Sequence, residues 1–289
     1  MSPGILLVDK PGGMTSHDVV SRARRALGTR KVGHAGTLDP MATGLLLLGV
    51  DSATRLLTYL VGLGKRYTAT IRLGAATDTD DAEGSVISTA DASGISGVDT
   101  SAFTGTIEQV PSSFSAVKVD GRRSYDRARA GEEVVLAPRT VTVSRFEVLA
   151  ERDEGQFLDV DVVVECSSGT YIRALARDLG RRLGVGGHLT ALRREAIGAF
   201  EVRDAVGVDD LDVASLRTPA SIAAQLFPVA RLDALQAVDL AHGKRVELAV
   251  PDAPVVAAIT GDDRLAGLVE VASGRARVLV NFPSDEVLA

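Results

Sequence analysis

A single aspartate, Asp39, has the clearest potential for chemistry in this sequence. It lies in GHAGTLDPMATGLLLL, between a glycine-rich turn and Pro40, with His34 five residues upstream. A carboxylate with a reference pKa of about 3.9 is ionised at neutral pH, so it can act as a nucleophile, a base or an electrostatic stabiliser without activation. The same pattern is also typical of a turn or cap residue. The neighbours of Asp39 must therefore decide its role.

Several other side chains could complete a site around such a carboxylate. Arg173 follows TY in TYIR, and a guanidinium close to Asp39 would orient the carboxylate and oppose the rise in pKa that burial causes. Tyr67 and Tyr171 stand beside basic residues, where they could stack on a base or fill the core. His34 has no cysteine or serine arranged beside it to form a triad. These residues permit nucleophilic chemistry without defining a substrate.

Charge is unevenly distributed along the chain. The 289 residues carry a formal net charge of -6, yet residues 1–72 contain ten Lys or Arg against four Asp. A basic segment around the candidate site suits an anionic substrate that is held locally, and a solvated basic face without function fits the charge equally well. Residues 204–289 contain seven Lys or Arg against thirteen Asp or Glu. We therefore do not expect strong phosphate binding by that segment.

Composition excludes several classes of protein. A hydrophobic share of 45% allows large cores. The longest apolar runs are far shorter than the roughly 20 residues of a membrane span, and the first residues lack a signal-peptide layout. The single cysteine, Cys166, excludes an intramolecular disulfide, and the four scattered histidines have no zinc-binding spacing. We therefore expect a cytoplasmic protein that uses neither redox nor metal chemistry.

Hydrophobic periodicity predicts the elements that must position these residues. It indicates strands in 4–10, 65–74 and 157–166, and helices in 15–28, where Thr15 and Asp18 match a capping box, and in 167–184. Residues 78–85, DTDDAEGS, place Glu83 where a calcium loop requires glycine, so we predict a solvated loop. Residues 111–134 predict a basic, irregular insertion, either a flap that contacts substrate or a plain surface excursion. Residues 229–289 predict a small β meander and a separate module.

Six blocks of sequence, in order from residue 5 to about residue 200, resemble those of the bacterial TruB-type tRNA pseudouridine-55 synthases. They are LLVDKPGGMTSHDVV, GHAGTLDPMATGLL, KRYTATIRLGAATDTDDAEG, VPSSFSAVKVDGRRSYDRAR, SSGTYIRALARDLG and GGHLTALRR. The resemblance implies an α+β fold with a mixed, mainly antiparallel sheet of the pseudouridine synthase type, flanking helices and a small C-terminal PUA-like β module. It also implies a catalytic domain at 1–228, with an insertion near 105–140, and the module at 229–289.

Members of that family isomerise uridine 55 in the T loop of tRNA to pseudouridine without a cofactor, and the resemblance implies roles for single residues. Asp39 matches the essential aspartate, proposed to attack either the base or the ribose C1′ of a flipped-out uridine. Tyr67 matches a tyrosine that stacks on the target base, and Arg173 matches the arginine that pairs with the catalytic carboxylate. The expected substrate-binding residues are His34, Tyr171, Leu189 and Lys10.

Two other functions stay open beside this one. An RNA-binding or RNA-remodelling protein could use the same pocket to hold a T arm without isomerising it. A metal-dependent phosphotransferase could use Asp39 as an acyl-phosphate nucleophile, although the chain lacks the P-loop motif GxxxxGK[ST]. For the first reading, we expect the T arm of tRNA as partner, no metal, no membrane contact and a monomer.

Overall fold

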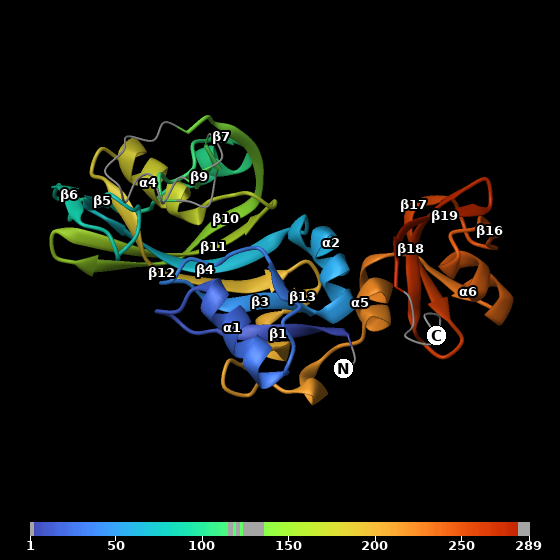
Figure 1. Ribbon diagram of the computed structural model, residues 1–289. Coiled ribbons are helices and arrows are strands. Elements are labelled where there is room, and N and C mark those ends of the chain that lie inside the picture. Colours follow the sequence, from blue (N-terminus) through green and yellow to red (C-terminus); the bar gives the residue numbers. More distant parts are fainter. Residues whose placement is uncertain (1–2, 115–117, 120–121, 124–135, 283–289) are drawn as a thin grey trace.

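The computed structural model describes residues 3–114, 118–119, 122–123 and 136–282 (Figure 1). Its largest feature is a ten-stranded sheet in the order β14-β1-β3-β12-β4-β11-β10-β7, with β2 paired to β3 and β13 paired to β12. These strands are β1 (Gly4–Lys10), β2 (Val32–Ala35), β3 (Thr43–Val50), β4 (Lys65–Leu73), β7 (Gly105–Gln109), β10 (Arg139–Glu154), β11 (Phe157–Cys166), β12 (Gly187–Ile197), β13 (Phe200–Glu201) and β14 (Val206–Gly207).

The remaining elements are smaller. A five-stranded sheet has the order β15-β17-β18-β19-β16, and two short hairpins stand apart from both sheets. The strands of the second sheet are β15 (Val229–Leu232), β16 (Val246–Glu247), β17 (Ala253–Thr260), β18 (Leu265–Ala272) and β19 (Arg275–Asn281), and those of the hairpins are β5 (Ala75–Thr77), β6 (Val86–Thr89), β8 (Lys118–Val119) and β9 (Arg122–Arg123). The α-helices are α1 (Ser16–Ala26), α2 (Leu57–Val61), α4 (Ile172–Arg182), α5 (Pro219–Leu226) and α6 (Ala234–Ala241), and short 3₁₀ turns are Asp51–Leu56, Ser101–Phe103, Val202–Asp204 and Val213–Ser215.

The large sheet is mainly antiparallel. Its parallel pairs among the described strands are β1 with β14 and β3 with β12. Strand β3 pairs with β1 along one edge, and with β12 at Thr43–Gly44 and β2 at Leu47–Val50 along the other, and its side chains are covered on both faces. The leucines Leu45 to Leu48 are accordingly 0% exposed. This sheet, the flanking helices and the C-terminal β module confirm the predicted α+β fold class.

Local sequence patterns explain the elements that surround the candidate site. In β4, Tyr67, Ala69, Ile71 and Leu73 are buried and alternate with partly exposed residues, as predicted. Helix α1 begins after Thr15, which forms the predicted capping box with Asp18. Helix α4 packs its apolar stripe, including Ile172 and Leu175, into the same core cluster as the buried face of β4. The start of α4 therefore lies over the middle of the sheet.

The prediction of a solvated loop at 78–85 is confirmed for Asp78, Ala82, Glu83 and Ser85, which are exposed, and is wrong for Asp80 and Asp81. Asp80 is 7% exposed and Asp81 is 3% exposed. Their carboxylates are buried because two arginines of α4 pair with them: Arg177 with Asp80 at 3.2 Å and Arg173 with Asp81 at 3.2 Å. A buried carboxylate is tolerated where a cation and hydrogen bonds compensate its lost hydration. The partner arginines follow more than 90 residues later, so the local composition gave no sign of them.

The predicted basic insertion lies partly outside the described residues. Strand β7, residues 110–114 and the hairpin of β8 and β9 are described, whereas residues 115–117, 120–121 and 124–135 are not. The described root of the insertion, residues 109–114, contacts the candidate site. Within the described part of the chain, none of the helices is long and apolar enough to cross a membrane.

The C-terminal sheet joins the large sheet through α5 (Figure 1). One core cluster includes Ile5 and Leu7 of β1, Ile222 of α5, and Ile259 and Leu268 of the second sheet. The predicted boundary between residues 228 and 229 coincides with the start of the second sheet at β15. Because the apolar core is continuous across this boundary, independent folding of the two parts stays a prediction.

Candidate active site

Asp39 lies in the loop between β2 and β3, and buried polar contacts fix this loop. The Ser16 hydroxyl, at the start of α1, accepts a hydrogen bond from the backbone N–H of Leu38 at 2.9 Å and donates to the Leu38 carbonyl at 3.2 Å. The ammonium of Lys10 donates to the Pro40 carbonyl at 3.2 Å. The residues directly before and after Asp39 are thus held by α1 and by the end of β1.

The predicted partnership of Asp39 and Arg173 is present. The Nε atom of Arg173 lies 3.0 Å from Oδ2 of Asp39, an ion pair in which the N–H is not aligned as a regular hydrogen bond. The Arg173 side chain is 4% exposed, whereas 34% of the Asp39 side chain faces solvent. Protein atoms surround most of the carboxylate and leave one side open. A reactive group that a ligand can reach, backed by a buried cation, suits nucleophilic chemistry.

Arg173 uses its remaining N–H donors to bind two other segments of the chain. Its Nη1 donates to the Thr79 carbonyl at 2.9 Å and pairs with Asp81 at 3.2 Å. Its Nη2 donates to the Phe114 carbonyl at 2.8 Å. One planar guanidinium therefore joins the Asp39 loop, the acidic loop at 78–85 and the root of the insertion.

The electrostatic environment raises the pKa of Asp39 above its usual value. Burial is the main cause, because it removes water from the charged form, and the nearby Asp81 carboxylate adds repulsion. Arg173 and Lys10 act in the opposite direction. The carboxylate is therefore held in a setting that increases its basicity while a guanidinium fixes its orientation.

Tyr67 lies on the buried face of β4 and is 8% exposed. It shares the core cluster with Leu38 and Leu189, and the Asp39 charge acts on its phenol. Burial raises the pKa of Tyr67, and the nearby positive charge of Arg194 opposes that rise. The Tyr67 side chain thus packs in the same core as Leu38, the residue before Asp39, and its phenol stays protonated at neutral pH.

Tyr171 and Leu189 flank Arg173 from two elements. Tyr171 is half-buried at the N-cap of α4, and the Gln109 side chain accepts from its N–H at 2.8 Å and donates to its carbonyl at 3.0 Å. Leu189, on β12, is 0% exposed, and its N–H donates to the Asp80 carbonyl at 3.1 Å. The structure therefore brings Asp39 and Arg173 into contact and places Leu189 in the core cluster that includes Tyr67, and contact of Tyr171 and Leu189 with a substrate stays a prediction.

The other two predicted substrate-binding residues have different surroundings. His34 is partly exposed on β2, which leads into the Asp39 loop, and its ring packs edge-on against His17 with centroids 5.6 Å apart. Lys10 is 0% exposed, and its ammonium donates to the carbonyls of Pro11, Met14 and Pro40. Burial lowers the pKa of Lys10 to about 8. Contact of either residue with a substrate stays a prediction, and in this structure Lys10 fixes backbone beside Asp39.

Sequence reasoning missed three residues of this site. Asp81 was assigned to a solvated loop, and Gln109 drew no attention as an uncharged residue at the end of a strand. Arg194 belongs to the block GGHLTALRR and was given no role, although it is 1% exposed. The alternation of buried residues in β12 could have indicated that Arg194 points inward, opposite to Arg193.

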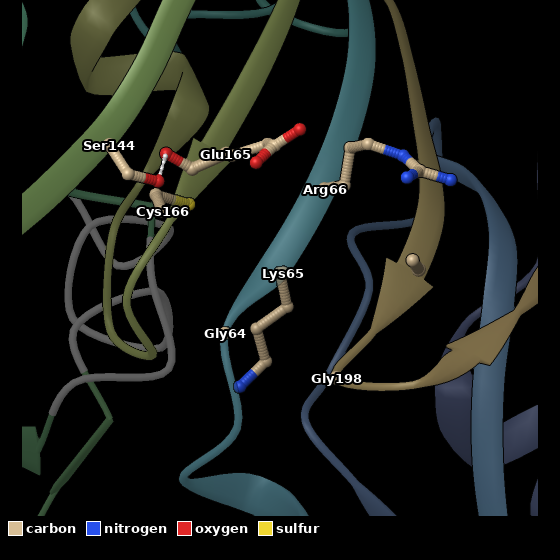
Figure 2. A pocket seen from close by; sticks show the side chains of 8 residues that line it. Gly64, Lys65, Arg66, Ser144, Glu165, Cys166 and Gly198 are labelled. Atoms are coloured by element: carbon tan, nitrogen blue, oxygen red, sulfur yellow. Dashed lines mark hydrogen bonds between the residues drawn. The ribbon is translucent and has the colours of Figure 1, made fainter.

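A separate cavity of about 230 Å³ lies where β4 begins, between Lys65–Arg66 and Glu165–Cys166 (Figure 2). The Lys65 and Arg66 side chains leave β4 in different directions there (Figure 2). The ammonium of Lys65 donates to the carbonyls of Val61 and Leu63, at 2.6 and 2.7 Å. The residues that line this cavity do not include Asp39 or Arg173. Within the described ranges, His, Cys, Asp and Glu form no group of three or more suited to a metal ion.

Three family models match consecutive parts of this chain. Residues 24–172 match the model of the TruB family pseudouridylate synthase (N terminal domain). Residues 173–236 match the tRNA pseudouridylate synthase B C-terminal domain, and residues 227–283 match the C-terminal model of tRNA pseudouridine synthase II. The matched ranges cover the second sheet and every strand of the large sheet except β1, and they contain the Asp39–Arg173 pair.

Whole-length relatives agree with these matches. The tRNA pseudouridine synthase B of Leifsonia xyli subsp. xyli is 59% identical over 98% of each chain, and that of Nocardia farcinica is 55% identical over 94% of this chain and 91% of its own. A solved H/ACA RNP bound to a substrate RNA containing 2′-deoxyuridine has a chain that is 25% identical, with a TM-score of 0.70 over 98% of this chain and 86% of that one. The chain therefore belongs to the TruB family of pseudouridine synthases.

Proposed function

We propose that this enzyme isomerises uridine 55 in the T loop of tRNA to pseudouridine, with Asp39 as the nucleophile on a flipped-out uridine and without a metal or organic cofactor. The ion pair of Asp39 with buried Arg173 is the observation that carries this proposal. The names of the relatives, tRNA pseudouridine synthase B, support tRNA as the substrate. The T arm as the bound region, the monomeric state and the cytoplasmic location belong to the same proposal.

The reaction needs few chemical groups. The N1–C1′ bond breaks, the uracil rotates, and a C5–C1′ bond forms, while C5 loses a proton and N1 gains one. No atoms are added, so one carboxylate that attacks C1′ or C6 and later leaves is sufficient. The Asp39 side chain suits this role because it is oriented by Arg173 and partly exposed to solvent.

The surrounding residues supply the enclosure that such a rotation requires. A stacked uridine must first be extruded from its loop, at a cost of a few kcal/mol that stacking and phosphate contacts offset. In the proposal, Tyr67 stacks on the flipped base, and Tyr171 and Leu189 bound the pocket around it. His34 supports the extruded conformation from β2. Lys10 acts next to Asp39, where it fixes the Pro40 carbonyl.

Tritium release from tRNA transcripts labelled at C5 of uridine tests the catalytic role of Asp39. The wild type should release tritium in the presence of EDTA, and Asp39→Asn should release none while it binds the transcript with unchanged affinity. Asp9→Asn is a matched control, because Asp9 pairs with Arg193 at 2.7 Å and not with Arg173. Silence of the wild type in EDTA would instead favour a metal-requiring enzyme, and release by Asp39→Asn would exclude Asp39 as the nucleophile.

A further inference from the structure

Arg194 is the largest side chain of the described residues that is almost completely buried. It lies on β12 and is 1% exposed. Its Nε donates to the Leu45 carbonyl at 2.7 Å, and its Nη2 donates to the Gly36 carbonyl at 3.0 Å. Its Nη1 lies 3.5 Å from the Thr37 carbonyl, at the limit of a hydrogen bond. Backbone carbonyls therefore surround this guanidinium.

These carbonyls lie on both sides of Asp39 in the chain. Gly36 and Thr37 precede it, and Leu45 follows it as the loop enters β3. The backbone of Arg194 is itself fixed to β3, because Arg194 and Gly44 are partners in the parallel pairing of β12 with β3. A Cβ at Gly44 would lie 2.3 Å from the Arg194 carbonyl oxygen, so only glycine allows this approach. One residue thus closes the Asp39 loop at its two ends.

Arg194 also faces Tyr67. The two residues are cross-strand partners in the antiparallel pairing of β12 with β4. Both are buried, and the positive charge of Arg194 acts on the Tyr67 phenol. Directly opposed residues on one face of a sheet have Cβ atoms about 4.5–5.5 Å apart, which leaves little freedom for the phenol ring. Arg194 therefore connects the two chain segments that carry Asp39 and Tyr67.

The charge of Arg194 has no carboxylate partner among the described residues. Burial of a cation without an ion pair is costly, and hydrogen bonds to carbonyls compensate it only in part. Stability alone therefore does not explain an arginine at this position. Its positive charge and its several N–H donors, which bind the Asp39 loop, explain it better.

We propose that Arg194 is a positioning residue for the isomerisation: its buried guanidinium binds both ends of the Asp39 loop, and its place opposite Tyr67 on the neighbouring strand limits the movement of that side chain. This inference rests on the proposed function, because it assigns Arg194 a role in the same pocket. It predicts that loss of the guanidinium lowers turnover much more than it weakens RNA binding, since Arg194 is too deeply buried to contact the bulk of an RNA.

The test compares Arg194→Met, Arg194→Lys and the control Arg193→Met in steady-state formation of pseudouridine 55. Arg193 precedes Arg194 on β12 but points to the opposite face, where it is 37% exposed and pairs with Asp9. We expect kcat of Arg194→Met to fall by about 100-fold, with KM within about threefold of the wild type. Arg194→Lys should recover part of the loss, about tenfold, because an ammonium keeps the charge and some carbonyl contacts. Arg193→Met should resemble the wild type.

Thermal melts of each variant separate positioning from folding. If Arg194→Met does not fold, Arg194→Lys decides: a lowered kcat with unchanged KM at a wild-type melting temperature supports the proposal, and a wild-type kcat overturns it. Wild-type turnover by Arg194→Met, or an equal loss in Arg193→Met, also overturns it. A wild type that forms no pseudouridine at position 55 refutes the proposed function, and the inference falls with it, whereas an active wild type with an active Arg194→Met refutes the inference alone.

Discussion

Substitution of Asp81 by asparagine probes how the site orients Arg173. Asp81 Oδ2 pairs with Nη1 of Arg173, and Asp81 Oδ1 accepts from the Thr79 hydroxyl at 2.6 Å and from the Glu83 N–H at 3.1 Å. In Asp81→Asn, the amide oxygen keeps the contacts with Thr79 and Glu83, which places the amide NH₂ against the guanidinium. A donor then faces a donor inside the protein, and the ion pair is lost.

The size of the effect follows from these contacts. Removal of one partner from a buried ion pair costs about 3–5 kcal/mol, but Arg173 retains Asp39 as a counter-ion, so we expect a loss of about 2–3 kcal/mol in the free energy of unfolding. A hydrogen bond to a charged group contributes about 1.5–3 kcal/mol. If this contact sets the orientation of Arg173, kcat should fall by about 10- to 150-fold, since each 1.4 kcal/mol is a factor of ten.

Asp81→Asn should also shift the pH dependence of catalysis in a definite direction. The negative charge of Asp81 is one cause of the raised pKa of Asp39, so its removal lowers that pKa. Because the nucleophile must be ionised, the acid limb of kcat/KM should move to lower pH in Asp81→Asn, even as the plateau falls. Single-turnover pseudouridine formation between pH 5 and 9, together with urea unfolding, measures both effects. A variant with the wild-type plateau and an unmoved acid limb would refute this reasoning.

Three further predictions concern the frame of the site. Gln109→Ala removes both hydrogen bonds to Tyr171, so urea unfolding should show a loss of about 1–3 kcal/mol, and kcat should fall more than KM rises; an unchanged kcat would separate Gln109 from catalysis. The pKa of Lys10 is about 8 in the folded protein and 10.5 ordinarily, so the unfolded chain binds more protons than the folded protein between these pH values. The stability of the wild type should therefore rise relative to that of Lys10→Met from pH 8 to 10, which thermal melts would measure. A chain ending at residue 228 exposes apolar residues of the shared core and should melt at a lower temperature or aggregate in light scattering; an unchanged melting temperature would show that the first part folds independently.

Local patterns predicted the elements of this fold well. The alternation in 65–73 and the capping box of Thr15 and Asp18 depend on neighbours within a few residues, and both are present. The meander of β17, β18 and β19 follows from turns and apolar runs in the same way. Periodicity does not give the order of strands, however, and the central parallel pairing of β3 with β12 joins residues about 150 positions apart.

The candidate site was predictable where the resemblance to a family supplied it, and less so elsewhere. Asp39 and Arg173 were paired in advance on that basis, and the structure places them in contact. The acidic loop was misjudged because composition cannot show that Arg173 and Arg177 arrive from a distant helix to neutralise it. Arg194 was overlooked for a related reason. Charged side chains are usually exposed, and the burial of Arg194 depends on backbone carbonyls of Gly36 and Leu45, which only the tertiary fold brings to it.

The measurement that tests the central claim most directly is base-resolution mapping of pseudouridine in unmodified tRNA transcripts after incubation with wild type or Asp39→Asn. The proposal predicts conversion at position 55 by the wild type in a single turnover, and no conversion by an Asp39→Asn protein whose melting temperature and affinity for the transcript match the wild type. Pseudouridine at position 55 in the presence of Asp39→Asn, or wild-type conversion at other positions with uridine 55 left intact, would contradict it.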